Sequence, residues 1–336
     1  MVQTVMFLQK SNIQYFLKYL PAYFLAIFVV LVKFIAPKVV ESVSTFMKNL
    51  DPWPVDQFGP VLERHIKYHA NYFNIFATVT VAVSFISGIF HALPVENDEE
   101  IMFTLAFFQE YFPKWKNCLS TVYRLGFLVL PFAMLVPFHI FIYAACHCQQ
   151  QIFMLLHIIE VINKTAKTEQ NRLLRDEKYQ KRVTTTFKFI IKRHCHLMKN
   201  GRDMVNQLRV YIFVLSASAG ALFICGAIYI TFQGLLKGRY LRLVTLIIPV
   251  VLIFVHVFFL GQRIEDMSGQ GFEVLRQSNW YHWNKENKMI YSIILANCKE
   301  SFKIQFSQSI AIDYKLAVSI LKSVYSTLSI LGYLRL

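Results

Sequence analysis

Two short clusters of cysteine and histidine are the first candidates for chemistry in this sequence. The first is Cys-His-Cys at residues 146–148, and the second is His-Cys-His at residues 194–196. Thiolate and imidazole groups bind zinc, but structural zinc sites usually space paired ligands two to four residues apart so that they converge on one ion. Residues i and i+2 of a helix point in different directions. We therefore predict no metal site at either cluster and no cofactor.

Motifs of the common enzyme classes are missing from the sequence. It contains no Walker A loop and no HExxH, GxSxG or GxGxxG motif, so we expect no enzymatic activity. His139 and His256 fall inside apolar segments, where ionisable residues often serve transport. No Asp or Glu accompanies them in these segments before Asp313. We therefore interpret both histidines as hydrogen-bonding partners between helices.

The composition indicates a membrane protein. Hydrophobic residues make up 55% of the chain, aromatic residues 15% and charged residues only 16%, whereas soluble domains contain about 25% charged residues. The net charge of +15 is concentrated in one loop, which indicates a cytoplasmic face rather than nucleic-acid binding. The six cysteines are dispersed, and residues 1–20 lack the pattern of a secretory signal peptide. The sequence predicts an all-α, polytopic membrane helix bundle.

Six apolar segments are long enough to cross a bilayer as helices. They cover residues 13–36, 72–93, 125–146, 210–232, 241–260 and 310–334. Four prolines, at positions 21, 131, 137 and 249, lie inside three of these segments and should kink rather than end them. Apolar periodicity continues through residues 152–162 and 184–208, so long helices should extend beyond the membrane and pack together there.

Basic residues gather in alternate loops. Residues 164–209 contain thirteen Lys and Arg, residues 261–309 six and residues 37–71 four, whereas the intervening loop carries the acidic stretch VENDEE from Val95. The positive-inside rule places the basic loops in the cytoplasm and, with six spans, both termini outside. The glycosylation sequon at Asn163 would then be cytoplasmic and unmodified. The basic run is either a solvated helix or a packed subunit contact.

The last apolar segment carries a polar stripe along one helical face. Its members recur at helical spacing and pass into bulky residues at the outer end; they are Ser319, Lys322, Ser323, Ser326, Ile330, Tyr333 and Leu334. Packing of small residues between helices could explain the serines. A charged Lys322 in lipid would cost about 2.5–3.5 kcal/mol, so we favour contact with water. The opposite side, with Leu316, Val318, Ile320, Leu321, Val324 and Leu328, can pack on neighbouring helices.

Residues 278–334 resemble the C-terminal signature of insect odorant receptors. The resemblance is carried by the tryptophan-bearing segment that starts SNWYHW, by the Ile-Asp pair before the last span, and by the run LAVSILKSVYS at residues 316–326. The rest of the chain agrees with that family in its layout of loops. This resemblance implies a subunit of a ligand-gated, non-selective cation channel in the plasma membrane of olfactory sensory neurons. Its partners would be a small volatile odorant, membrane lipid and an odorant co-receptor in a hetero-tetramer.

The resemblance also implies a division of the chain. Residues 1–260 would form the transmembrane bundle with an outer odorant pocket and a long basic inner loop (147–209). Residues 261–309 would form a cytoplasmic anchor, and residues 310–336 the pore-lining span, with a gate at Ile330 and Leu334. The family has seven spans and a cytoplasmic N-terminus, whereas we count six, so the family's first span is expected to be missing.

The odorant pocket is expected in the outer half of the bundle. An aromatic stripe on the first span and a small, polar stripe on the second could line it; these are Tyr15, Tyr19 and Tyr23, then Ser84, Ser87, Gly88 and His91. Aromatic walls with few polar groups suit small volatile ligands. Ordinary helix packing would explain the same residues.

Three other receptor or carrier classes would show different sequence features. A gustatory-type channel would carry a Thr-Tyr-hydrophobic motif where this chain has Val324-Tyr325-Ser326. A G-protein-coupled receptor would carry Asp-Arg-Tyr and Asn-Pro-x-x-Tyr motifs, which this sequence lacks. A transporter is expected to show paired, broken helices.

Overall fold

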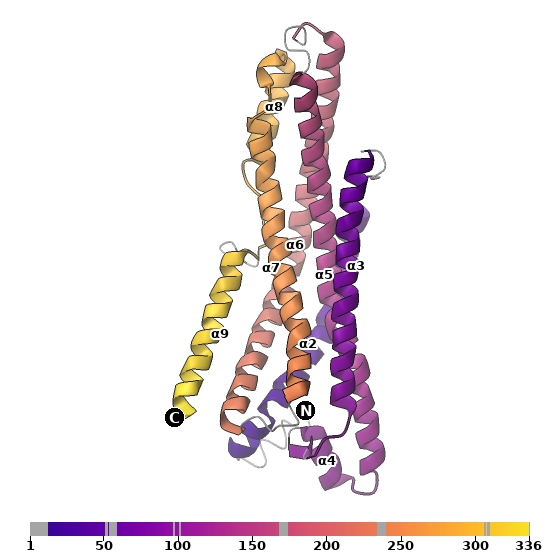
Figure 1. Ribbon diagram of the computed structural model, residues 1–336, viewed down its shortest axis with the longest axis vertical. Helices are drawn as coiled ribbons and strands as arrows, with labels where there is room; N and C mark the ends of the chain where they lie inside the picture. Colours follow the sequence, from indigo (N-terminus) through magenta and orange to yellow (C-terminus); the bar gives the residue numbers. More distant parts are fainter. Residues whose placement is uncertain are drawn as a thin grey trace.

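The computed structural model describes residues 13–50, 53, 59–96, 98–100, 102–167, 174–233, 240–305, 307 and 310–335. These residues form an elongated bundle of helices (Figure 1). In chain order the helices are α2 (Ile13–Leu50), α3 (Pro60–Ala92), η2 (Asp98–Glu100), α4 (Phe103–Tyr111), α5 (Lys116–Lys167), α6 (Glu177–Gln233), α7 (Tyr240–Arg276), η4 (Trp280–His282), α8 (Lys285–Cys298) and α9 (Tyr314–Arg335). The predicted all-α class is confirmed.

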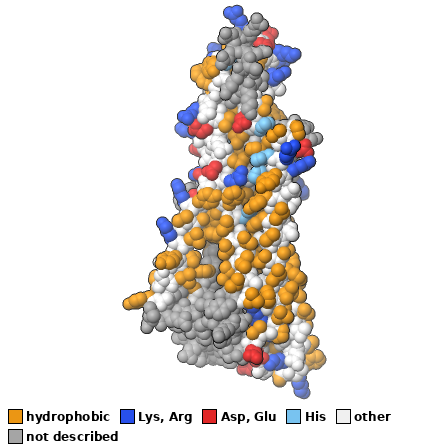
Figure 2. Space-filling view, viewed as in Figure 1, with side chains coloured by type: hydrophobic (Ala, Val, Ile, Leu, Met, Phe, Trp, Pro, Cys, Tyr) orange, Lys and Arg blue, Asp and Glu red, His pale blue; other side chains and the backbone are white. Residues whose placement is uncertain are grey.

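Several helices are much longer than a bilayer is thick. α5 has 52 residues and α6 has 57, so each extends over roughly 80 Å, against about 30 Å for the hydrocarbon core. Five helical stretches in the described part have the length and composition of membrane spans: Ala22–Leu50, Pro60–Ala92, Lys116–Ile162, Glu177–Ile228 and Val244–Arg276. α9 is 22 residues long and is not one of these five. Figure 2 shows hydrophobic side chains over the lower part of the visible face, with Lys and Arg gathered mainly above.

The helix ends differ from those that hydropathy predicts. α2 continues through Pro37 to Leu50, and α3 starts at Pro60, so much of the predicted loop 37–71 is helical. Proline fits the first turn of α3 because its missing N–H has no partner there in any helix. Gly59 precedes it with φ of 89°, a conformation that glycine adopts without strain. The prolines within α5 and α7 lie inside continuous helices, as expected.

The most deeply buried side chains gather where the helices extend beyond the apolar part. Trp283 packs edge-to-face on Phe187 of α6, with ring centroids 4.8 Å apart, and its Nε1 donates to the Tyr179 hydroxyl at 3.2 Å. Ile190, Ile264 and other large apolar side chains belong to the same buried cluster. Burial from water drives packing in this region, whereas a lipid environment supplies no such force.

A buried polar network joins α6 to α8. The Asn287 amide donates to the Gln180 side chain and main chain at 2.9 and 3.0 Å, and the Thr184 hydroxyl donates to Asn287 Oδ1 at 2.7 Å. Asn284 caps α8 by accepting from the Asn287 N–H at 2.8 Å. The apolar periodicity of the basic segment is therefore explained at least partly by packing within this chain.

The segment before α9 is fixed to α7. A side chain at Gly261 would overlap the carbonyl oxygen of Ile312, which is itself buried. Asp313 accepts from the Leu316 N–H at 2.7 Å and so caps α9. The sequence-based span 310–334 therefore starts too early: Asp313 belongs to the cap, and α9 begins at Tyr314.

Candidate functional site

The predicted aromatic stripe lies at the end of the bundle that contains α4 (Figure 1). Tyr19 is only 4% exposed; its hydroxyl donates to the Glu99 carbonyl at 2.9 Å and its ring meets Phe103 edge-on at 5.6 Å. Tyr23 is partly exposed and contacts Phe24 at 5.8 Å. Tyr15 belongs to α2, but its side chain lies outside the described part. Tyr19 therefore ties α2 to the loop before α4.

The predicted small and polar stripe faces α5. Ser84, Ser87 and Gly88 are buried, and a side chain at Gly88 would lie 2.5 Å from the Phe127 carbonyl oxygen. His91 Nδ1 is 2.8 Å from the Ser87 carbonyl oxygen, and its ring is 5.8 Å from that of Phe127. Gly88 thus permits the close crossing of α3 and α5, which favours the packing interpretation for this residue. The Ser84 hydroxyl oxygen is buried without a hydrogen-bond partner in the described structure.

An ion-pair cluster at the same end was missed by sequence reasoning. Asp98, 3% exposed, accepts from Arg242 at 2.6 Å and pairs with Arg124 at 2.7 Å. Arg242 also donates to the carbonyls of Phe90, at 2.7 Å, and Leu93. The cluster therefore joins the end of α3, the loop with η2, and the starts of α5 and α7. A sequence signal existed, because Arg242 lies in an apolar segment where a charge requires a partner.

Asp98 is held in its ionised form by this cluster. Burial opposes its ionisation, but hydrogen bonds from Arg242, the Val95 N–H and Arg124 outweigh burial, so its pKa lies below the ordinary value of 3.8. The end of the bundle that contains α4 therefore holds buried charged groups that compensate one another.

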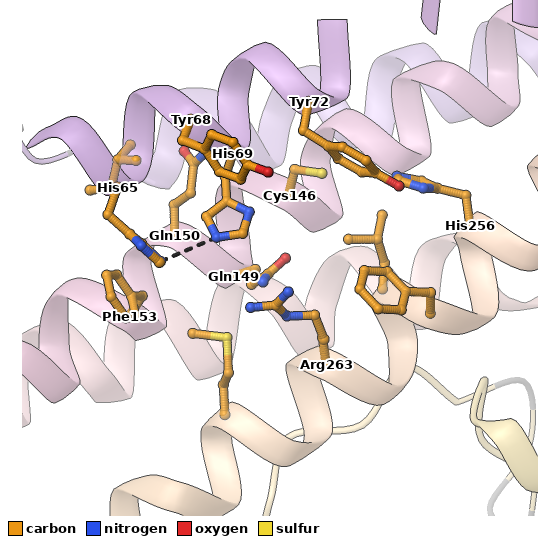
Figure 3. Close-up of a pocket in the computed structure, with 14 residues that line it drawn as sticks. His65, Tyr68, His69, Tyr72, Cys146, Gln149, Gln150, Phe153, His256 and Arg263 are labelled. Atoms are coloured by element: carbon orange, nitrogen blue, oxygen red, sulfur yellow. Dashed lines mark hydrogen bonds between the residues drawn. The ribbon is translucent and has the colours of Figure 1, made fainter. Parts of the chain in front are cut away.

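A cavity of about 270 Å³ lies near the other end of the apolar region. Figure 3 shows it between α3 and α7, with α5 behind. Its wall combines imidazole, phenol, amide and guanidinium groups with apolar side chains; the polar members are His65, Tyr68, His69, Tyr72, Gln149, Gln150, His256 and Arg263. This cavity could not be predicted from the sequence, because its residues come from three helices that are distant in the chain.

The two intramembrane histidines behave differently. His139 Nε2 lies 2.7 Å from the Thr80 hydroxyl, so the predicted hydrogen bond between helices is confirmed. His256 stacks on Phe76 with ring centroids 4.0 Å apart, and its Nε2 is buried with no partner among the described residues. The predicted hydrogen bond to another helix is therefore not formed by Nε2 of His256 among the described residues.

α9 packs on α6 and α7 through a narrow face. Leu316, Ile320 and Val324 are half-buried, whereas the other members of the predicted packing side, Val318, Leu321 and Leu328, are exposed in the single chain. The polar stripe is exposed at Ser319, Lys322, Ser323, Ser326, Ile330 and Tyr333. The Leu334 side chain lies outside the described part. The exposed faces of α9 are thus not covered by other described residues of this chain.

The cysteine and histidine clusters do not form a common site in the described structure. Cys148 is buried, and the His147 ring contacts Tyr143 at 4.5 Å. His194 Nε2 lies 3.8 Å from the sulfur of Cys298. Among the described residues, no three His, Cys, Asp or Glu side chains are grouped to hold a metal ion.

Comparisons with known proteins agree on one family and one fold. The family model for the 7tm odorant receptor matches residues 60–325. The structure of the insect olfactory receptor OR5 from Machilis hrabei in complex with eugenol is similar, with a TM-score of 0.71 and 11% identity, over 96% of this chain and 82% of that one. A second OR5 structure gives a TM-score of 0.69 and 10% identity, over 90% of this chain and 78% of the other. No curated protein sequence matches the chain.

Proposed function

This chain belongs to the odorant receptor family, and we propose that it is the odorant-binding subunit of a ligand-gated, non-selective cation channel. The observation that carries the proposal is the family match itself, which runs from the start of α3 into α9. It includes four of the five candidate spans, from α3 to α7, and the first part of α9, which carries Ser319, Lys322 and Ser323. The channel would act in the plasma membrane of an olfactory neuron, assembled with an odorant co-receptor as a hetero-tetramer.

The proposed pore is lined by α9. Support comes from the exposure of its polar stripe, because no helix among the described residues covers Lys322 and the serines. Water in a pore would hydrate these groups, whereas lipid would not. The bulky Ile330, Tyr333 and Leu334 follow at the end of α9 that lies level with α4 (Figure 1), where apolar rings could exclude water and close the pore.

The proposed odorant site lies at the outer end of the bundle, beside α4. Tyr19, Tyr23 and Phe103 supply aromatic surface there, and Ser84 supplies an unpartnered hydroxyl. Such surfaces suit a small volatile molecule that is held by burial and stacking. The eugenol complex of OR5 supports this ligand class for a protein of the same fold.

Co-expression with an odorant co-receptor tests the proposal. We expect cation currents that depend on this chain when cells are exposed to a panel of volatiles, using this chain and a version extended at its N-terminus. Currents evoked only by tastants would favour the gustatory-type alternative. Surface-expressed complexes that never conduct with any volatile would contradict the proposal.

A further inference from the structure

The cavity between α3, α5 and α7 lies where the charge-free parts of two helices begin. On α3, Glu63 and Arg64 precede the lining residues and Lys67 lies among them, and no Lys, Arg, Asp or Glu follows Lys67. α7 carries no such residue from Leu243 to Gln262, and its charges resume at Arg263. Gln149 and Gln150 of α5 lie at the same level of the cavity wall. Figure 2 shows histidines at the border between apolar and charged surface. The cavity therefore occupies the depth of lipid headgroups.

The cavity has an uncompensated positive group. Arg263 makes no ion pair with any described residue, and its guanidinium points into the space between α3 and α7 (Figure 3). No Asp or Glu lines the described wall. The nearby acids have other partners. On α7, Glu265 pairs with Lys303 at 2.7 Å and Asp266 accepts from the Gln262 amide at 2.8 Å. On α3, Glu63 pairs with Lys67.

Other polar groups of the wall have unused hydrogen-bonding capacity. His256 is 5% exposed and its buried Nε2 has no hydrogen-bond partner in the described structure. His65 and His69 contact each other through Nε2 atoms 3.2 Å apart, so only one of them can donate in that contact. Tyr68, Tyr72, Gln149 and Gln150 add hydroxyl and amide donors. The wall is thus rich in donors and contains no carboxylate.

We propose that this cavity binds the phosphate-bearing headgroup of an anionic membrane lipid. Arg263 would pair with the phosphate through two parallel hydrogen bonds, a geometry that guanidinium and phosphate share. The histidines and amides would contact the remaining oxygens of the headgroup. Basic pockets between transmembrane helices on the cytoplasmic side are known to suit such headgroups, and the positive-inside rule assigns this end to the cytoplasm.

A lipid fits better than a free anion because apolar surface continues beside the cavity. Ile75 and Val79 of α3 and Val251 and Val255 of α7 are exposed on the membrane side of the cavity. Acyl chains could lie along these side chains while the phosphate reaches Arg263. A neutral volatile odorant would leave the guanidinium without a counter-charge, so we assign the cavity to the lipid.

The test measures lipid retention and does not use odorant gating. The full chain is placed in phosphatidylcholine nanodiscs that contain a small fraction of phosphatidylinositol phosphate, and retained lipid is counted by native mass spectrometry. We expect the parent to retain the anionic lipid selectively. Arg263→Gln should weaken retention about tenfold or more, as expected for a lost charge-assisted pair. Arg276→Gln, on the same helix but paired with Glu273 and exposed, should retain it like the parent.

Further measurements separate the possible occupants. His69→Gln, at a half-exposed position where unfolding is not expected, should also lower retention, and Arg263→Lys should restore only part of it. Equal losses in Arg263→Gln and Arg276→Gln would overturn the proposal, because they would indicate general attraction to a basic surface. Displacement of the lipid by soluble inositol phosphate at equal concentration would overturn the assignment to lipid. Displacement by a neutral odorant would make the cavity an odorant site instead.

Discussion

At the scale of single residues, Asp98 supports a stability prediction. Asp98→Asn removes the charge between Arg242 and Arg124 and leaves two guanidinium groups facing one another in a buried position. Breaking a buried pair typically costs about 3–5 kcal/mol, so the thermal midpoint of the purified receptor should fall clearly. Glu99→Gln is the matched control, because Glu99 pairs with Lys116 at 39% exposure and surface pairs contribute about 0–1 kcal/mol. Equal midpoints for both variants would contradict the role of the cluster.

The same carboxylate makes stability depend on pH. The pKa of Asp98 in the folded protein is below 3.8, its ordinary value. The stabilisation from ionised Asp98 is therefore complete above that value and is lost as pH falls through the lower, folded-state pKa. The parent should lose more stability than Asp98→Asn when melting is followed below about pH 4. Parallel acid profiles for the two proteins would show that Asp98 is not the group responsible.

Tyr23 and Tyr19 are predicted to have different roles, with Tyr23 in contact with the ligand and Tyr19 in support of the fold. Tyr23 is partly exposed, so Tyr23→Ala should raise the odorant concentration for half-maximal current several-fold, since an aromatic contact contributes on the order of 1 kcal/mol. Tyr19 is buried and hydrogen-bonded to the Glu99 carbonyl, so Tyr19→Phe should lower thermal stability without changing the order of odorant potencies. Unchanged responses of Tyr23→Ala to every active odorant would make this stripe a packing surface.

Sequence reasoning at this scale identified residue types but not their partners. It placed the acidic stretch outside, but it could not distinguish Asp98 from Glu99, because the partner Arg242 lies 144 residues further along the chain. It paired His139 with another helix correctly, since a polar group in lipid requires a partner. It missed the inner cavity, since the convergence of Gln149, His256 and Arg263 depends on how three helices cross.

At the scale of elements, the contact between α7 and the segment before α9 supports a prediction with an internal control. Gly261→Ala places a methyl group against the Ile312 carbonyl oxygen, so it should displace this segment and loosen the position of α9. We expect lower thermal stability by about 1–3 kcal/mol and fewer assembled channels at the cell surface. Gly269→Ala adds the same methyl group on α7 where the nearest atom, Ser301 Cβ, is 3.9 Å away.

The control variant Gly269→Ala should not lose thermal stability. A Gly-to-Ala change inside a helix favours helix formation by up to about 1 kcal/mol, so Gly269→Ala should be neutral or slightly stabilising. The two variants differ only in what the added methyl group meets. If Gly261→Ala melts and assembles like Gly269→Ala, the contact between α7 and Ile312 can accommodate a methyl group, and the prediction is wrong.

Hydropathy predicted the existence of these helices better than their ends. Periodicity correctly indicated that long helices continue past the apolar segments, as α5 and α6 do. It ended the first span before Pro37, whereas tertiary packing along α6 and α5 keeps α2 helical to Leu50. It also treated Asp313 as part of the last span, because the hydrogen bond from the Leu316 N–H is not visible in a hydropathy profile.

At the scale of the whole molecule, sidedness is directly testable. A glycosylation acceptor inserted beside the exposed Glu96 should be modified, whereas the native sequon at Asn163 should not, because the two lie at opposite ends of the bundle. An acceptor inserted in the exposed turn at Arg175 controls for the helical position of Asn163 and should also stay unmodified. The measurement is a mobility shift that a glycosidase removes. Modification at Arg175 alone would reverse the orientation assigned to the chain.

The surroundings of α9 are a property of the whole molecule in its membrane. Long stretches of α9 are exposed in the single chain, so contact with water, lipid or a neighbouring chain there is set by the membrane and by assembly and could not be predicted from the sequence. The structure does show which residues of the predicted packing side of α9 contact the rest of the chain. Leu328 is 46% exposed, while Ile320 is half-buried among core residues, so Ile320 is the better position for testing contacts within the chain.

The gate of the proposed channel gives a prediction for the molecule as a whole. Ile330 is 59% exposed and follows the polar stripe toward the end of α9; Leu334 shares its helical face one turn later. If apolar side chains there exclude water from the closed pore, Ile330→Ser or Leu334→Ser should admit water and raise basal current, or change ion permeability, in cells that co-express the co-receptor.

The comparison with Ile320→Ser distinguishes the gate from the packing of α9. Ile320→Ser removes apolar contacts between α9 and the bundle, so it should reduce surface assembly without a rise in current per assembled channel. All variants must be compared at matched surface expression, because in the proposed hetero-tetramer the other subunits would contribute their own gate residues and dilute the effect. A permeability change in Ile320→Ser, with Ile330→Ser and Leu334→Ser conducting like the parent, would mean that the opposite face of α9 lines the pore.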